Sequence, residues 1–340
     1  MRIVLLVLKW LGTVVGGLAG VVVALALWNG SFWSSYSAPT TLLAHRGLGQ
    51  TYTREDLDNE TCTATRTYPP EHPYLENTLA SMQAAFDAGA DIVEFDIHPT
   101  TDGQFAVFHD WSIDCRTEGK GVTREQAMSH LKTLDIGYGY TADGGKTFPF
   151  RGKGVGLMPT MDEVLAAFPD RRFLINIKSN DPSEGELLAD RLLELPAEHL
   201  DRLMAYGGDA PIGRLRARIP KFRAMSRKTL TSCGVNYIAY GWSGAIPESC
   251  RDTLLLVPSN TTYLIWGWPN LFLERMAGAN TPVFVRGPVT RQMRRLDAAG
   301  IDDLAAARGF PQDFPGGIWT DRIDRIASHF GRKSKSSQPD

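Results

Sequence analysis

The sequence predicts an α/β protein, a (β/α)₈ TIM barrel preceded by an N-terminal transmembrane helix. Two observations carry this prediction. The first 30 residues contain a long apolar run, and from residue 41 onward short β-like runs alternate with amphipathic stretches. Such alternation is what a parallel sheet covered by helices requires. No composition break divides residues 41–330, and a chain of 340 residues suits one barrel of about 250 residues.

Residues 1–30 are predicted to form a membrane anchor. The 18 residues from Leu11 to Trp28 are uncharged and mostly apolar. At ~1.5 Å per residue they nearly span a ~30 Å hydrocarbon core. Arg2 and Lys9 precede this run and no Lys or Arg follows until Arg46. The positive-inside rule therefore predicts that the barrel lies outside the cytoplasm, in the periplasm or the extracellular space.

Two properties of the anchor stay open. Ala24-Leu25-Ala26 has the small-x-small form of a signal-peptidase site, so a cleaved signal peptide is the alternative to an uncleaved anchor. Gly12, Gly16 and Gly20 repeat every four residues and would allow a weak dimer through the helix. Residues 31–40 are expected to be a linker and residues 331–340 a polar tail.

The charge of the chain argues against nucleic acid as a partner. The formal net charge is −2, and no basic stripe with interleaved aromatic residues occurs. We therefore expect a small-molecule or lipid substrate, with the membrane as the second partner.

The β-like runs are one more than a (β/α)₈ barrel needs, so we expect one of them to be wrong. They are residues 41–44, 91–97, 105–108, 172–178, 203–206, 221–225, 253–257, 282–285 and 317–320.

Helices are predicted between these runs. Leu79, Met82 and Phe86 fall at i, i+3 and i+7 and define one apolar helical face. Thr160 and Glu163 have capping-box spacing and mark another helix start. In place of a short βα loop, residues 48–75 form a long polar stretch, which predicts an insertion near the site.

Cys62, Cys115, Cys233 and Cys250 are an even set of cysteines, compatible with disulfides in an oxidising compartment. Free buried thiols are the alternative, and the absence of a Cys-x-x-Cys pair argues against zinc. If Cys62 and Cys115 lie at one rim of the barrel, a bridge between them would hold the insertion over the site.

Chemistry-bearing residues gather at the ends of the first strands. Glu94, Asp96 and His98 recur at every second position, so an extended strand points them to one face. Two buried carboxylates this close repel each other unless a cation neutralises them, which favours a hard divalent metal such as Ca²⁺ or Mg²⁺. The alternative, an exposed edge strand, is disfavoured by the apolar residues between them.

Two histidines are predicted at the same rim. His45 ends the first run and His109 follows the third, so in a parallel barrel both emerge at the C-terminal face, where active sites form. Imidazoles suit acid and base roles near neutral pH. Arg46 and Lys178 are cations at this rim and could bind a phosphate. The set favours metal-assisted phosphoryl transfer.

These residues lie in motifs that resemble the glycerophosphodiester phosphodiesterase family of the phosphatidylinositol-phosphodiesterase-like TIM-barrel superfamily. The matching stretches are His45-Arg46-Gly47, Glu76-Asn77-Thr78, GADIVEFDIHPTTDG at 89–103, His109-Asp110, CRTEGKG at 115–121, MPTMDEVL at 158–165 and GIWTDRID at 317–324. The resemblance is strong in the first half of the chain and thin across residues 203–315.

The resemblance implies a division of roles. Glu94 and Asp96 would be metal ligands, and His45 and His109 the acid/base pair. The resemblance does not say which histidine begins as the base, and we expect His109 to be the base and His45 the acid. Arg46 and Lys178 would contact the phosphate, with Glu76 and Asn77 nearby on the substrate side. The reaction it implies is hydrolysis of a glycerophosphodiester to an alcohol and glycerol 3-phosphate in two steps, through a cyclic phosphate.

One position departs from the family pattern. Asn176 stands where the family usually carries a third metal-binding glutamate. An amide oxygen can still bind Ca²⁺ or Mg²⁺, but one unit of negative charge is lost. Two alternatives therefore stay open: a lysophospholipase D-type enzyme that requires an acyl chain, and a catalytically silent, membrane-anchored binding protein.

Overall fold

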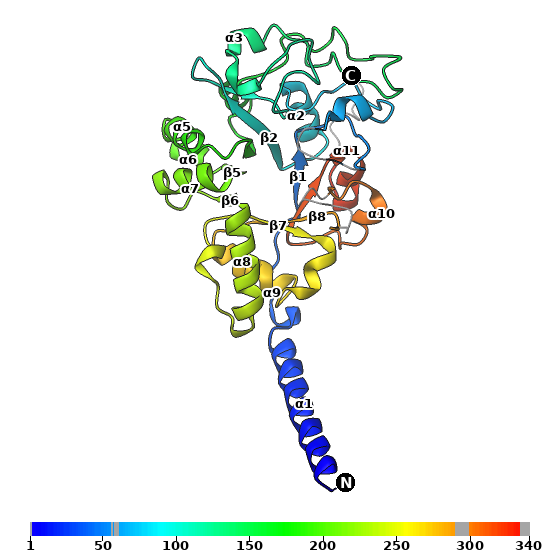
Figure 1. The fold of residues 1–340 in the computed structure, drawn as a ribbon, viewed down its shortest axis with the longest axis vertical. Helices are drawn as coiled ribbons and strands as arrows, with labels where there is room; N and C mark the ends of the chain where they lie inside the picture. The colour runs from blue at the N-terminus through cyan, green and yellow to red at the C-terminus, as the bar shows by residue number, and fades with distance from the viewer. Residues whose placement is uncertain (1, 56, 58–60, 290–298, 334–340) are drawn as a thin grey trace.

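The computed structural model describes residues 2–55, 57, 61–289 and 299–333. The remainder of the predicted insertion (56 and 58–60) and of the predicted tail (334–340) lies outside these residues. One long apolar helix, α1 (Arg2–Trp28), extends from one end of a barrel (Figure 1). Its length and composition suffice to cross a membrane.

Eight parallel strands form a nearly closed barrel in the order β6-β5-β4-β2-β1-β9-β8-β7. At the seam, the Ala224 amide donates to the carbonyl of Asp252 (3.4 Å) and the Thr253 hydroxyl to that of Ala224 (2.9 Å), so β6 meets the segment that leads into β7. The strands are β1 (Thr41–His45), β2 (Ile92–Pro99), β4 (Arg172–Ile177), β5 (Leu203–Gly207), β6 (Ala224–Ser226), β7 (Leu255–Pro258), β8 (Val283–Arg286) and β9 (Gly317–Thr320).

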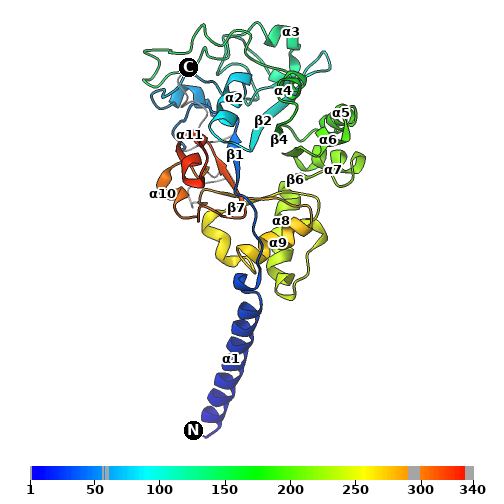
Figure 2. The ribbon, with the colours of Figure 1, turned by 180° about the vertical axis from the view of Figure 1, so that it is seen from behind.

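Helices connect successive strands and cover the outside of the barrel (Figures 1 and 2). Both predicted helices are confirmed. The first buries Met82 and Phe86 but leaves Leu79 exposed, and the second begins where Thr160 forms a capping box with Glu163. The helices after α1 are α2 (Leu79–Asp87), α3 (Met128–Leu131), α4 (Met161–Ala167), α5 (Pro182–Leu193), α6 (Ala197–Leu200), α7 (Asp209–Arg218), α8 (Arg227–Tyr240), α9 (Asn270–Gly278), α10 (Leu304–Ala307) and α11 (Ile323–Ile326).

The expectation that one β-like run is not a strand is wrong, because all nine form strands. The ninth, β3 (Phe105–Val107), is however not a barrel strand, and it runs antiparallel to the last residues of β2. The prediction that His109 ends a parallel strand therefore has the wrong geometry. The chain turns back along β2, and the amide of Phe108 donates to the carbonyl of Asp96 (3.1 Å), which still returns His109 to the barrel rim.

The barrel interior changes from apolar to polar along the strands. Leu43 pairs in register with Ile92, and two residues further His45 pairs with Glu94. Further along β2, Asp96 is level with Asn176 on β4. Asn176 is in turn level with Tyr206 on β5. Because residues i and i+2 of a strand lie on the same face, β1, β2, β4 and β5 each contribute an apolar residue to the floor and a polar one to the mouth. The floor is formed by Leu43, Ile92, Leu174, Met204, Met225, Leu254, Leu256, Phe284 and Trp319.

The predicted insertion packs on a second, smaller apolar cluster. This cluster joins Ala64 and Leu75 of the insertion to residues between 106 and 158, among them Phe108 and Ile113. The Cys62–Cys115 disulfide crosslinks its two halves, so the hypothesis of this bridge is confirmed. A second disulfide joins Cys233 to Cys250.

Candidate active site

The end of β1 has a left-handed backbone that directs Arg46 into the mouth of the barrel. Arg46 has φ +58° and Gly47 has φ +77°. A Cβ atom on residue 47 would lie 2.6 Å from the Ser81 hydroxyl, so this position requires glycine. A non-glycine residue at positive φ costs energy and is frequent in functional sites. Here it lets the Arg46 amide donate to Glu94 Oε2 (3.1 Å).

The two carboxylates of β2 are fully buried but differ in their partners. Glu94 accepts from the hydroxyl of Tyr206 (2.7 Å) and from the Arg46 backbone, which are both neutral donors. Asp96 instead faces cations. Lys178 Nζ lies 3.4 Å from its Oδ1, and Arg46 Nε lies 3.2 Å from its Oδ2 without hydrogen-bond geometry.

Two amides complete the surroundings of Asp96. Asn176 Nδ2 donates to its Oδ1 (2.7 Å), and Asn77 Nδ2 donates to its Oδ2 (2.9 Å). The Asn77 side-chain oxygen also accepts from the Asp96 amide (3.2 Å). In the structure both polar ends of the Asn77 side chain therefore position Asp96, which is a supporting task that the sequence did not indicate.

Each candidate acid/base histidine is held at Nδ1 by a carboxylate. His45 Nδ1 lies 2.5 Å from Asp321, which directly follows β9, and His109 Nδ1 lies 2.7 Å from Asp110. An imidazole fixed at Nδ1 keeps Nε2 for another partner. His45 Nε2 is 3.8 Å from Glu94 Oε2, which places it beside the buried acidic pair.

Arg116 links the His109–Asp110 pair to Glu76, the carboxylate that pairs with Arg46. Its guanidinium is buried, and it donates to Asp110 Oδ2 (2.8 Å) and lies 3.2 Å from Glu76 Oε1. Glu76 in turn accepts from Arg46 (2.9 Å). Arg116 also donates to Thr63 of the insertion (2.7 Å), so this network starts next to the Cys62–Cys115 disulfide.

The two histidines have opposite pKa shifts. Burial and the charges of Arg46 and Lys178 lower the pKa of His109 to about 4. Burial and Arg46 also act to lower the pKa of His45, but Glu94 and Asp321 outweigh them and raise it above its usual value. His109 is therefore neutral over most of the pH range, whereas His45 is the more readily protonated of the two.

The site contains oxygen donors of the kind that a divalent cation binds. Burial, and then the charge of Asp96, raise the pKa of Glu94 to about 7, which is the electrostatic cost that a bound cation would remove. Glu94, Asp96 and the amide oxygen of Asn176 are oxygen ligands of the kind that Ca²⁺ and Mg²⁺ prefer. The described residues nevertheless contain no group of three His, Cys, Asp or Glu side chains placed to hold a metal. Asn176 occupies the position at which the resemblance implies a third carboxylate.

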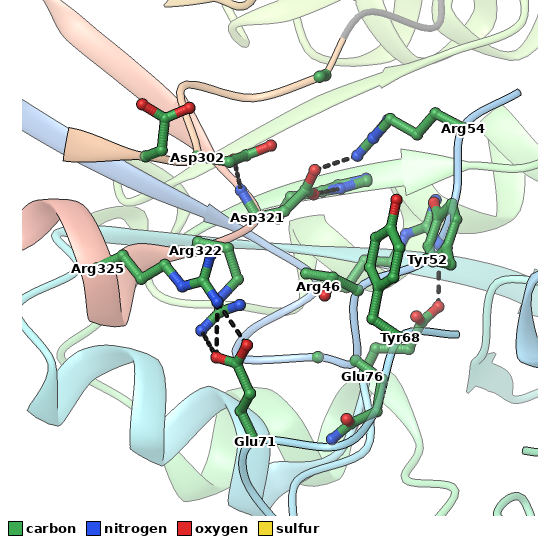
Figure 3. Close-up of a pocket in the computed structure, with 16 residues that line it drawn as sticks. Arg46, Tyr52, Arg54, Tyr68, Glu71, Glu76, Asp302, Asp321, Arg322 and Arg325 are labelled. Atoms are coloured by element: carbon green, nitrogen blue, oxygen red, sulfur yellow. Dashed lines mark hydrogen bonds and ion pairs between the residues drawn. The ribbon is translucent and has the colours of Figure 1, made fainter. Parts of the chain in front are cut away.

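A cavity of about 530 Å³ opens beside these residues, between the insertion and the ends of β1 and β9. Figure 3 shows Arg54 of the insertion directed at Asp321, with Tyr52 and Tyr68 lining the same space. Arg54 forms an ion pair with the Asp321 carboxylate that holds His45. The insertion thus contributes directly to the wall of the site.

The structure brings all the predicted site residues into one charge network, and it adds four that sequence reasoning did not assign: Tyr206, Arg116, Arg54 and Asp321. Arg116 and Asp321 lie within stretches that carry the family resemblance, CRTEGKG and GIWTDRID, and this was the available signal. Tyr206 could have been suspected because it occupies the polar end of a barrel strand. Nothing in the local sequence around Arg54 indicates its ion pair.

Comparisons with known proteins agree with this geometry. Residues 45–196 match the glycerophosphoryl diester phosphodiesterase family. A glycerophosphodiester phosphodiesterase of Caldanaerobacter subterraneus is 36% identical over 103 residues, which are 30% of this chain and 39% of that protein. The chain thus aligns with about two fifths of that relative's length.

Solved structures show the same fold. The glycerophosphodiester phosphodiesterase of Agrobacterium tumefaciens has a TM-score of 0.55 at 21% identity, covering 86% of this chain and all of that one. An Oleispira antarctica phosphodiesterase, solved in complex with sn-glycerol-3-phosphate, has a TM-score of 0.53 at 18% identity, covering 86% of this chain and 98% of that one. Residues 45–196 are thus similar to the glycerophosphoryl diester phosphodiesterase family, and the barrel has the fold of solved members of that family.

Proposed function

We propose that the protein is a glycerophosphodiester phosphodiesterase that releases an alcohol and glycerol 3-phosphate. One observation carries the proposal: two histidines, each fixed at Nδ1 by a carboxylate, lie in one charge network with the buried pair Glu94 and Asp96. The family match and the named activity of the relatives support it. The glycerol 3-phosphate bound to the Oleispira antarctica enzyme supports the proposed product.

Arg46 and Lys178 are proposed to bind the substrate phosphate. Both approach Asp96 in the structure, so their positive charge already points into the mouth of the barrel. The family generally uses a divalent cation, and we assign Glu94, Asp96 and Asn176 as its ligands. A bound Ca²⁺ or Mg²⁺ ion would polarise a phosphoryl oxygen.

His109 and His45 are proposed to share the proton transfers. In the first step, His109 Nε2 accepts the proton of the glycerol 2-hydroxyl as its oxygen attacks phosphorus. The bond from phosphorus to the leaving alcohol breaks, and His45 donates its proton to that alcohol. In the second step, His45 accepts a proton from water, and His109 returns its proton to the oxygen released from the cyclic phosphate. Both histidines end in their starting states.

The pKa shifts support this assignment. A base must begin neutral, and the cations beside His109 favour its neutral form. An acid must begin protonated, and the carboxylates beside His45 favour its charged form. Substrate binding would also adjust the base, because an anionic phosphodiester offsets the charges of Arg46 and Lys178 and so raises the pKa of His109 toward neutral pH.

The α1 helix is proposed to anchor the barrel outside the cytoplasm. Arg2 and Lys9 precede the apolar run, which sets the expected direction. Disulfides persist in oxidising compartments, so Cys62–Cys115 and Cys233–Cys250 support the same side. Protease added to intact cells is expected to digest the barrel and not the first ten residues. A weak dimer through Gly12, Gly16 and Gly20 stays a prediction.

A direct assay tests the proposed activity. The full chain, purified in detergent, is incubated with glycerophosphocholine, and choline and glycerol 3-phosphate are quantified by ³¹P and ¹H NMR with added Ca²⁺, Mg²⁺ or chelator. Turnover is expected only with a divalent cation, and it should be lost in His109→Ala. The matched control is His199→Ala, because His199 belongs to the short helix α6, outside the charge network.

The other readings are outcomes of the same assay. Turnover of lysophosphatidylcholine without turnover of glycerophosphocholine would indicate a lysophospholipase D-type enzyme. If neither substrate turned over with either ion, the protein would be a binding protein and the proposal would be wrong.

A further inference from the structure

An uncommon set of large apolar side chains is exposed where the barrel meets α1. Phe32 and Trp33, in the 3₁₀-helix η1 (Ser31–Trp33), are each 69% exposed. Tyr240 at the end of α8 is 60% exposed, and Trp242 in the 3₁₀-helix η4 (Gly241–Ser243) is 42% exposed. We call these four residues the aromatic collar. Clustered exposed apolar residues of this kind mark an interaction surface.

Three long segments around the aromatic collar carry no charge, although Glu274 and Arg275 lie beside them and bond to Ser34 and Asn29. No Asp, Glu, Lys or Arg occurs in residues 10–45, 229–247 or 259–273, although these four residue types make up 22% of the whole chain. Two of these segments lie together at the collar, since the Trp266 indole donates to the carbonyl of Ile238 (2.9 Å) and the Tyr237 hydroxyl to that of Trp266 (3.1 Å). A water-exposed surface is ordinarily rich in charge, so this depletion indicates a less polar partner.

Hydrogen bonds fix the collar to the end of α1. The Asn29 side chain donates to the carbonyls of Leu25 (3.0 Å) and Trp242 (2.8 Å) and accepts from Arg275 (3.1 Å). Ser31 Oγ accepts from the amide of Asn270 (2.8 Å), at the start of α9. The barrel is therefore held directly against the end of the helix, without a free linker between them.

The helix itself indicates which partner covers the collar. Trp10 and Trp28 stand at the two ends of its uncharged run, 18 residues apart, which corresponds to about 27 Å at ~1.5 Å per residue. This separation is close to the ~30 Å thickness of a hydrocarbon core, and tryptophans gather at the two membrane interfaces. With Trp28 at the outer interface, the collar begins only four residues further along the chain, at the level of the lipid headgroups.

We propose that the aromatic collar docks the barrel onto the outer surface of the lipid bilayer and holds the active-site mouth away from it. The site lies at the C-terminal ends of β1 and β9, whereas α1 leaves from the opposite end of the molecule (Figures 1 and 2). The docked enzyme takes water-soluble glycerophosphodiesters and not lipids resident in the same bilayer. This substrate class rests on the proposed activity, and the docking rests on the proposed anchoring by α1 and not on that activity.

A label at single positions tests the docking without any need for turnover. All four native cysteines are in disulfides, so Phe32→Cys, Tyr240→Cys and, as a control, Lys146→Cys each add one reactive thiol. Lys146 is exposed and lies in the loop 141–147, which begins beside the insertion, where the Thr141 amide donates to the carbonyl of Ala64. Each full-length variant is labelled with an environment-sensitive fluorophore, reconstituted into phosphatidylcholine vesicles and quenched with spin-labelled lipids.

We expect the labels at positions 32 and 240 to emit at shorter wavelength and to be quenched at least threefold more strongly than the label at position 146. Quenching at position 240 equal to that at position 146 would show that the barrel stands free of the bilayer and would overturn the docking. Failure of the full chain to float with vesicles would overturn it as well.

The substrate class is tested on vesicles of the same composition. They contain the full chain without any of the added cysteines. Glycerophosphocholine in the aqueous phase is expected to be hydrolysed at least tenfold faster than lysophosphatidylcholine incorporated in the vesicle membrane. The reverse order, with position 240 still quenched, would overturn the proposed orientation of the mouth. No hydrolysis of either substrate would overturn the proposed function and leave the docking result standing.

Discussion

The two histidine regions of the site are built alike and behave differently. In each, a carboxylate holds Nδ1, and an arginine holds that carboxylate: Arg54 for the Asp321–His45 pair, and Arg116 for the Asp110–His109 pair. The pKa of His45 is nevertheless raised and that of His109 is lowered. Burial and Arg46 act to lower the pKa of both rings. At His109 the charge of Lys178 adds to this effect, whereas at His45 the charges of Glu94 and Asp321 outweigh it. The carboxylate at Nδ1 orients each histidine, and all the surrounding charges together decide its protonation.

The largest effect is expected when each histidine is removed and the leaving group of the substrate is varied. This experiment tests whether the two histidines differ in role. His45→Ala and His109→Ala are each expected to lower kcat by about 10²- to 10⁴-fold with glycerophosphocholine. A p-nitrophenyl ester has a leaving group that needs no protonation, so His45→Ala should recover most of its activity with it, whereas His109→Ala should not. Equal recovery in both variants would contradict the separate roles of acid and base. The measurement is kcat with each substrate.

Removing the arginine behind each pair gives the next largest effect. Arg116→Met leaves Asp110 and Glu76 without their shared partner and should lower kcat by about 10- to 100-fold, as for other residues that orient a catalytic ligand. Arg54→Met removes one partner of the more open pair, so we expect a smaller loss. The pH profile of kcat/KM separates a loss of His109 orientation from a general loss of protein stability. Only a change at His109 moves the acidic limb of this profile. An unshifted acidic limb in a folded Arg116→Met would exclude the positioning role.

The proposed binding of a divalent cation by Glu94, Asp96 and Asn176 is tested at Asn176. Asn176→Glu restores a third carboxylate beside Asp96 and is expected to tighten Mg²⁺ or Ca²⁺ binding by about tenfold, since ligand charge tunes affinity in such sites. Isothermal titration of the ion reports this without turnover. Asn176→Gln is the matched control, because it changes length and adds no charge. Equal ion affinity in both variants would show that position 176 is not a ligand.

The smallest expected effect is a shift in the pH profile of kcat/KM, which reports the pKa values of the two histidines separately. The base must be neutral, so kcat/KM should fall below a limb at about pH 4, the value of His109 in the free enzyme. The acid must be protonated, so activity should fall above a limb that lies higher than pH 6.5, the ordinary value for histidine. Asp321→Asn removes a charge that raises the pKa of His45 and should move this second limb down by about one unit. A profile unchanged by Asp321→Asn would contradict the electrostatic account.

Much of this site was predictable because its residues lie on or directly after strands. Alternation along β2 places Glu94 and Asp96 on one face, and the position of His45 at the end of β1 places it at the mouth. The direction of β3 was not predictable, because a short alternating run reads the same whether it pairs parallel or antiparallel. His109 lies at the predicted rim of the barrel, but it follows an antiparallel strand and not a parallel one.

The contribution of distant segments was the least predictable part. Asp321 meets His45 because β9 pairs with β1, and these residues are 276 positions apart. Arg54 reaches Asp321 from an irregular segment with no periodic pattern, so its target depends on the packing of the insertion on the second apolar cluster. The loss of a carboxylate at Asn176 was visible in the sequence, but its effect on ion affinity requires measurement.

The Cys62–Cys115 bridge closes a covalent ring of the chain with a sequence separation of 53 residues. Glu76, Glu94, Asp96 and His109 all lie inside this ring, whereas His45, Lys178 and Asp321 lie outside it. By the chain-entropy estimate such a ring restricts the unfolded chain by about 4 kcal/mol. A single proteolytic cut within the ring would leave its two fragments covalently joined, so the half of the site that carries the acidic pair would survive damage that would separate an unbridged chain.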